Sequence, residues 1–150
     1  MKKIFIYFSL TGNGDLVSDK LPNDIDKRKV IMKKKLPKKF FFIVMKGGFL
    51  AGIKAKSKLV NFDNDVSDYD EVIIGSPIWN GRFSTPINTV LRDVDLTGKK
   101  IRFILYSGSG EAKPAIKKIN KKYKDSDVLI LKEPKNYPEE LEKVVDFINK

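Results

Sequence analysis

The chain has 150 residues, of which 41% are hydrophobic, and a formal net charge of +11. This size and apolar content predict one domain, residues 1–150, and no apolar run is long enough to cross a bilayer. The absence of Cys and His excludes thiolate nucleophiles, disulfides, thiolate zinc sites and imidazole-based catalysis, so redox chemistry would need a bound organic cofactor. Because the amino terminus lacks a secretory signal, we expect a cytoplasmic protein, and we expect a monomer.

The excess positive charge is concentrated in one part of the sequence. Residues 27–58 contain twelve Lys or Arg and no acidic residue, whereas the rest of the chain holds eighteen basic and nineteen acidic residues. This basic segment is either a solvated surface or a docking patch. No RNA-binding motif or recognition-helix pattern accompanies it, and we expect no DNA partner.

The hydrophobic pattern predicts five strands that alternate with five helices. In chain order, the strands are expected at 4–8, 28–32, 72–74, 101–106 and 128–131. The helices are expected after a cap at Asn13, at 42–53, at 86–94, from Pro114 and at 138–148. The connections are too long for hairpins, so the pattern predicts a doubly wound α/β fold, a parallel sheet with helices on both faces.

Ligands of such folds bind at the carboxyl ends of the strands, which directs attention to the loop after the first strand. It consists of Ser9, Leu10, Thr11, Gly12, Asn13 and Gly14. Its hydroxyls and backbone N–H groups, at the start of a helix, are suited to binding a phosphate. Because the loop lacks Lys and Arg, the phosphate would be bound only by the dipoles of these groups and of the helix. The alternative is a turn whose side chains only cap the helix.

Two later loops follow the third and fourth strands. The second loop contains Ser76, Pro77, Ile78, Trp79, Asn80 and Gly81, and the third contains Ser107, Gly108, Ser109 and Gly110. Trp79 either stacks on a planar cofactor or folds inward as a plug. The glycines of the third loop let backbone N–H groups approach a ring edge, although a plain turn explains them equally well.

Together, these segments resemble the flavodoxin family, and in particular its small flavodoxin-like members. The resemblance is carried by residues 8–13, by 69–79 and by 98–108, in the family's order. It implies strand order 2-1-3-4-5 and non-covalently bound FMN. The phosphate would lie at the first loop and the ring between the second and third loops, with Trp79 stacked on it.

The leading functional hypothesis is an electron carrier that shuttles electrons between redox partner proteins, and it requires no catalytic residue. Arg82 and Lys113 are positively charged and flank the second and third loops, which would enclose the flavin ring. We therefore expect an acidic redox partner. One alternative is an FMN-dependent NAD(P)H:quinone-type reductase, and another is a flavin-free binding module that uses the basic segment. Asp63, Asp65 and Asp68 are expected to form a solvated loop and not a metal site, since they lack the glycine and terminal Glu of a calcium loop.

Overall fold

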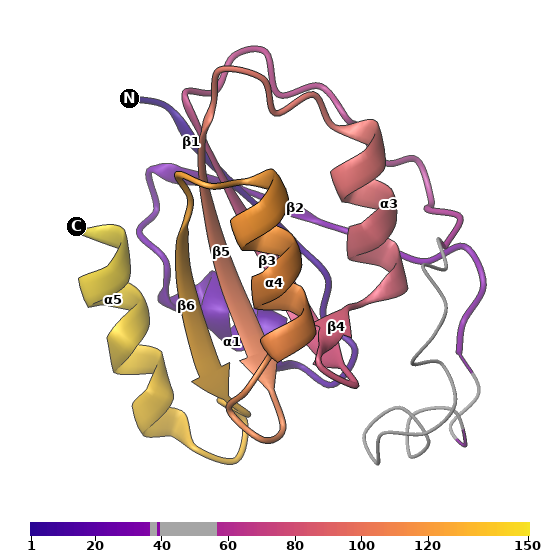
Figure 1. Cartoon of the computed structure of the whole chain (residues 1–150), viewed down its shortest axis with the longest axis vertical. Helices are drawn as coiled ribbons and strands as arrows, with labels where there is room; N and C mark the ends of the chain where they lie inside the picture. Colours follow the sequence, from indigo (N-terminus) through magenta and orange to yellow (C-terminus); the bar gives the residue numbers. More distant parts are fainter. Residues whose placement is uncertain (37–38, 40–56) are drawn as a thin grey trace.

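A parallel sheet lies between two layers of helices in the computed structural model, which describes residues 1–36, 39 and 57–150 (Figure 1). Its parallel strands are β1 (Lys3–Tyr7), β2 (Ile25–Lys29), β3 (Glu71–Trp79), β5 (Lys100–Ser107) and β6 (Asp127–Lys132). They are ordered β2-β1-β3-β5-β6, which confirms the predicted doubly wound class and the order 2-1-3-4-5 for the parallel strands. A short strand that was not predicted, β4 (Arg82–Phe83), pairs with β3 in the antiparallel direction.

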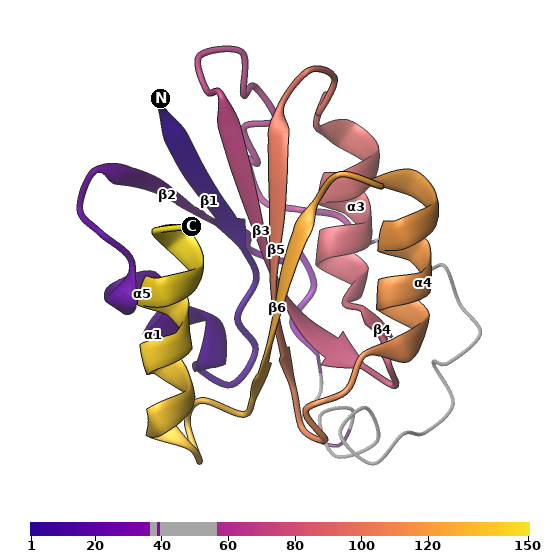
Figure 2. The same ribbon diagram turned by 60° about the vertical axis from the view of Figure 1, so that its left-hand side comes forward.

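The helices cover both faces of the sheet, as predicted (Figure 2). Helices α1 (Asn13–Lys20) and α5 (Glu142–Ile148) lie on one face, and α3 (Thr85–Asp93) and α4 (Lys113–Lys122) lie on the other. One turn of 3-10 helix, η2 (Pro138–Leu141), precedes α5. The helix predicted at 42–53 lies outside the described residues. None of the helices in the described ranges is long and apolar enough to cross a membrane.

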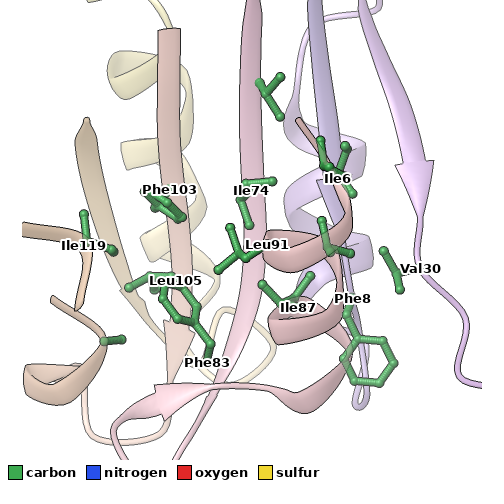
Figure 3. Close-up of a cluster of buried hydrophobic side chains, with 14 of the residues drawn as sticks. Ile6, Phe8, Val30, Ile74, Phe83, Ile87, Leu91, Phe103, Leu105 and Ile119 are labelled. Carbon is green, nitrogen blue, oxygen red and sulfur yellow. The ribbon is translucent and has the colours of Figure 1, made fainter. Parts of the chain in front are cut away.

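The strand pattern explains why both faces must be covered. Side chains alternate across a strand, so Ile6 and Ile74 point toward α3 and α4, while Phe5 and Ile73 point toward α1 and α5. All four are buried. Figure 3 shows the first of these cores, in which Ile87 and Leu91 of α3 pack over the sheet. The unbroken apolar run 72–74 therefore lies in a central strand, β3, as the sequence predicted.

The predicted second strand at 28–32 is wrong in position. The observed β2 pairs with β1 from Ile25, opposite Lys3, to Lys29, opposite Tyr7. Beyond it, Met32 makes only an isolated bridge to Leu59. As an edge strand, β2 is specified by backbone pairing to β1, and its charged sequence carries no apolar signal, whereas the apolar run that follows attracted the prediction.

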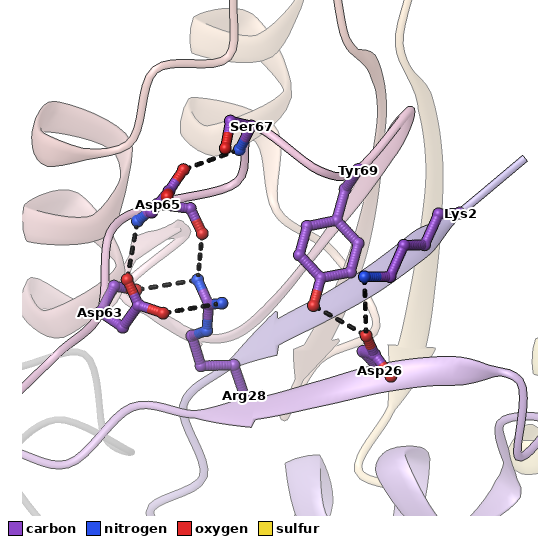
Figure 4. A network of polar contacts seen from close by, with 7 residues as sticks. All are labelled: Lys2, Asp26, Arg28, Asp63, Asp65, Ser67 and Tyr69. Carbon is purple, nitrogen blue, oxygen red and sulfur yellow. Dashed lines mark hydrogen bonds and ion pairs between the residues drawn. The ribbon is translucent and has the colours of Figure 1, made fainter.

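A polar network fastens β2 to the loop before β3 (Figure 4). The Arg28 guanidinium donates to the carbonyl oxygens of Asp63, at 2.9 Å, and Asp65, at 2.8 Å, and pairs with the Asp63 carboxylate at 3.1 Å. Hydrogen bonds from the Ser67 backbone N–H and hydroxyl lower the pKa of Asp65. These two aspartates therefore hold the loop to β2.

Candidate cofactor site

The loops after β1, β3 and β5 meet at one edge of the sheet, as the sequence predicted. Tyr7 pairs with Gly75, and Pro77 pairs with Tyr106, so the carboxyl ends of the three strands are adjacent. This edge is where doubly wound folds bind their ligands.

In the first loop, Ser9 performs the capping role that the sequence analysis assigned to Asn13. Its Oγ accepts hydrogen bonds from the backbone N–H groups of Gly14, at 3.1 Å, and Asp15, at 3.3 Å. Gly12 is the N-cap residue, with φ 99° and no side-chain cap. Asn13 is already helical, and its amide donates to the Thr11 hydroxyl at 3.4 Å. The prediction that Asn13 caps the helix is therefore wrong, because the chain turns into the helix one residue earlier.

Lys135 brings a positive charge to this loop, and sequence reasoning missed it. Its backbone N–H donates to Asn13 Oδ1 at 2.8 Å, and its ammonium group donates to the Thr11 carbonyl oxygen at 3.3 Å. Lys135 lies in the connection between β6 and η2, 122 positions from Asn13 along the chain. The loop lacks Lys and Arg in its own sequence, but the fold places an ammonium group beside it. No local pattern indicates this contact.

Gly14 is buried beneath the loop and leaves no room for a side chain. A Cβ placed there would lie 2.5 Å from the Tyr106 hydroxyl and 2.9 Å from the Phe8 carbonyl oxygen. The Tyr106 hydroxyl donates a hydrogen bond to that same carbonyl oxygen. Burial raises the pKa of Tyr106 well above its ordinary value of 10.0, with the charge on Asp15 adding to the effect. Tyr106 therefore supports the first loop from below as a protonated donor.

This burial predicts a specific alkaline transition. Because the folded state holds the Tyr106 proton more tightly than the unfolded chain does, its contribution to stability is complete below the ordinary pKa of 10.0 and is lost as the pH rises through the folded pKa. In a titration followed by tyrosinate absorbance and circular dichroism, we expect Tyr106 to ionise only as the protein unfolds. Tyr106→Phe should remove that step, whereas the control Tyr137→Phe, at an exposed position, should keep it. Ionisation of Tyr106 near its ordinary pKa in a folded protein would contradict the prediction.

The second loop is a β-hairpin, which the sequence analysis did not predict. Strand β3 continues to Trp79, and Ile78 pairs with Phe83 and Trp79 with Arg82 across a two-residue turn. The turn residues Asn80 and Gly81 have φ of 49° and 73°. Two consecutive positive φ values are typical of a type I′ turn, for which Asn-Gly is the strongest local signal, and the sequence contained it.

This hairpin changes which residues of the second loop reach the surface. Trp79 is only 7% exposed and packs edge-on against Phe8, with 6.1 Å between ring centroids. Ser76 is buried, and its hydroxyl donates to the Pro77 carbonyl oxygen at 2.9 Å. Ile78 belongs to the core. Of the six predicted residues of this loop, only Pro77, Asn80 and Gly81 are exposed or half-buried. Trp79 folds inward, which is the second of the two alternatives that the sequence left open.

The third loop is a closed turn held by its own serines. The Ser107 hydroxyl donates to the Glu111 carbonyl oxygen at 2.7 Å, and the Glu111 backbone N–H donates to Ser109 Oγ at 3.2 Å. Gly110 has φ 77°, a conformation that favours glycine. Gly108 and Ser109 are exposed, so the rim of the turn faces solvent beside the other two loops.

This strand order, with helices on both faces, defines the doubly wound α/β class, whose ligands bind outside the carboxyl ends of the strands. The particular family follows from the sequence match. A model of the flavodoxin family matches residues 49–145, more than half of the chain, and the chain belongs to that family. FMN is the cofactor of flavodoxins.

Solved structures show the same fold. A candidate flavoprotein from Bacteroides uniformis matches with a TM-score of 0.72 and 22% identity, over 99% of this chain and 98% of its own. A flavoprotein from Lactobacillus acidophilus, in complex with FMN, matches with a TM-score of 0.56 and 20% identity, over 86% of this chain and 91% of its own. No curated protein matches the sequence.

The first loop fits the phosphate end of FMN. It places the Thr11 hydroxyl, the amide of Asn13 and the amino-terminal end of α1 beside the Lys135 ammonium group. These are hydrogen-bond donors and a fixed positive charge, which is the chemistry that a phosphate monoester requires.

Proposed function

We propose that this protein is an electron carrier that uses FMN bound at the edge formed by the loops after β1, β3 and β5. The observation that supports it most directly is the Lys135 ammonium group, 3.3 Å from the Thr11 carbonyl oxygen of the hydroxyl-rich loop at the start of α1. When bound, FMN supplies the redox chemistry, which a chain without Cys or His cannot provide through a thiol or an imidazole.

The residues have separate tasks in this proposal. The first loop, Ser9 to Gly14, and Lys135 hold the phosphate. The exposed backbone around Asn80 and Gly81 and the rim of the third loop, Ser107 to Gly110, border the polar edge of the ring. Trp79 lies inward, with its ring packed on Phe8, and supports the hairpin that borders the ring. No acid or base is needed, because the task is to bind and orient the ring.

Binding of FMN to the purified 150-residue chain is the direct test. We expect one FMN per chain at micromolar concentrations, with quenching of both flavin fluorescence and the fluorescence of the single Trp. The Trp signal reports the site because Trp79 lies on the hairpin that borders it. Trp79→Phe, which keeps a buried aromatic ring, should retain FMN but lose that second signal. Absence of FMN binding would refute the proposal.

Lys135 provides a prediction about the phosphate alone. Lys135→Met removes the ammonium group and keeps the backbone hydrogen bond to Asn13. An exposed charged contact contributes about 0.5–1.5 kcal/mol, so the Kd for FMN should rise about twofold to tenfold at low salt. The Kd for riboflavin, which lacks the phosphate, should not change. Lys143→Met, on α5, is the matched control, and equal effects of the two variants on FMN binding would contradict the assignment.

The rival functions give different results in the same preparation. A reductase would oxidise NAD(P)H and reduce a quinone with no other protein present. We expect no such turnover from a carrier, which needs a separate protein to reduce it. A flavin-free module would bind neither FMN nor riboflavin.

A further inference from the structure

A cationic groove runs between α3 and α4, on the face of the sheet opposite α1 and α5, and encloses about 570 Å³. Its floor is apolar and consists of Phe83, Leu91, Pro114 and Ala115. Its rim carries six cationic side chains, which are Arg82, Arg92, Lys117, Lys118, Lys121 and Lys122, and the groove has no acidic lining residue in the described part of the chain. We call this surface the α3–α4 groove.

Arg92 pairs with Asp93, but much of the positive charge of this groove has no acidic partner in the described part of the chain. Helix α4 contains five lysines and no acidic residue. Across residues 1–36, 39 and 57–150, no carboxylate forms an ion pair with Arg82, Lys117 or Lys121, and all three side chains are exposed. Keeping like charges together on one short helix has an electrostatic cost, which a negatively charged partner would offset.

The groove adjoins the proposed ring site. The Ala115 backbone N–H donates to the Gly81 carbonyl oxygen at 2.9 Å, so the hairpin turn is fixed to the first turn of α4. At Gly81, a Cβ would lie 2.7 Å from Pro114 Cδ, which shows how closely the two elements pack. Arg82, next in the chain, belongs to the groove rim. A partner in the groove would therefore reach the hairpin that borders the ring.

We propose that the α3–α4 groove docks an acidic polypeptide of the redox partner, with carboxylates on the cationic rim and an apolar side chain on the floor. The redox identity of that partner rests on the proposed function, whereas the docking itself does not. An apolar centre with a charged rim is the usual anatomy of a protein–protein interface. The basic segment 27–58 is not required by this proposal.

Two other anionic partners fit the groove less well. RNA recognition needs exposed aromatic rings for base stacking, but Phe83 is only 4% exposed and the Lys118 ammonium lies over its ring, 5.4 Å from the centroid. A membrane surface needs exposed apolar anchors. The large exposed apolar residues of the described chain, Met1, Ile31, Val60 and Tyr137, all lie outside the groove.

The test uses a fluorescent amphipathic peptide of about 15 residues, long enough to form a helix, in which glutamates flank a row of leucines. A peptide with glutamines in place of the glutamates is the control ligand. The variant K117E/K121E reverses two rim charges. K27E/K150E changes the net charge by the same amount at exposed positions outside the groove.

We expect the acidic peptide to bind the chain, and we expect its affinity to fall as the salt concentration rises. We expect K117E/K121E to raise its Kd about tenfold at low salt, and K27E/K150E to change it less than twofold. In NMR titrations, the shifted backbone amides should cluster at residues 81–92 and 113–122. The peptide should bind with the same Kd whether or not FMN has been added. The experiment therefore distinguishes a protein that fails to bind FMN from a groove that fails to dock the peptide.

Several results would overturn the proposal. One is absence of peptide binding. Another is an equal rise of the peptide Kd in K117E/K121E and K27E/K150E, which would mean that the peptide responds only to the net charge of the protein. Shifts confined to residues 27–58 would assign docking to the basic segment instead. Tighter, groove-dependent binding of a single-stranded RNA or of phosphatidylserine vesicles would mean that the groove serves a different partner.

Discussion

Arg102→Met should lower the free energy of unfolding by about 3–5 kcal/mol, because it leaves Glu71 charged and buried without its main partner. Arg102 Nε lies 3.3 Å from Glu71 Oε1, and the two residues are 1% and 0% exposed. Asp127, at 3.6 Å, and the Phe147 carbonyl oxygen also contact the Arg102 guanidinium, so this residue joins β3, β5, β6 and α5. Urea unfolding followed by circular dichroism measures the loss.

A matched control compares the stability cost of breaking this buried ion pair with that of breaking an exposed one. Arg92→Met breaks an exposed contact with Asp93 and should cost less than about 1 kcal/mol. The double variant Glu71→Gln/Arg102→Met removes both charges, and it should be more stable than Arg102→Met alone. Because the pair lies at the amino ends of β3 and β5, far from the cofactor loops, the folded variants should keep the wild-type Kd for FMN. Equal costs for Arg102→Met and Arg92→Met would show that the buried pair contributes little.

Gly14→Ser should both destabilise the protein and weaken FMN binding. A Cβ at this position would lie 2.5 Å from the Tyr106 hydroxyl and 2.9 Å from the Phe8 carbonyl oxygen, so the start of α1 must shift. Overpacking of this kind costs about 1–3 kcal/mol, although replacing glycine within a helix is ordinarily favourable. The shift would also disturb the Gly14 N–H bond to Ser9 Oγ, at 3.1 Å, and we expect the Kd for FMN to rise about tenfold.

A double-mutant cycle assigns this cost to its cause. Tyr106→Phe removes the nearest clashing atom, so Gly14→Ser should cost less stability in that background than in the wild type. Part of the cost should remain, since the Phe8 carbonyl oxygen stays in place. An identical cost in both backgrounds would show that Tyr106 does not exclude a side chain at position 14. The cycle is measured by urea unfolding, with FMN titration of each folded variant.

Local patterns in the sequence determined the fold class and the three loops. The apolar run at 72–74 predicts a central strand because an unbroken apolar strand must be covered on both faces, and it lies within β3. Ile87, Val90, Leu91 and Val94 predict one face of a helix by their spacing, and all four are buried. The strand-to-loop order placed three loops at one sheet edge, since parallel strands end at the same side. The FMN contacts assigned to these loops stay a prediction.

Only the tertiary structure decided which side chains serve those loops. Lys135 reaches Thr11 because the connection from β6 to η2 passes the amino-terminal end of α1, a contact between segments far apart in the chain that no local pattern encodes. Trp79 turns inward because β3 continues into a hairpin, and Gly14 is required because Tyr106 fills the space below it. The cationic groove exists because α3 and α4 lie side by side. Periodicity within a segment shows which residues are buried. The packing of segments that are distant in the sequence decides which side chains those residues contact.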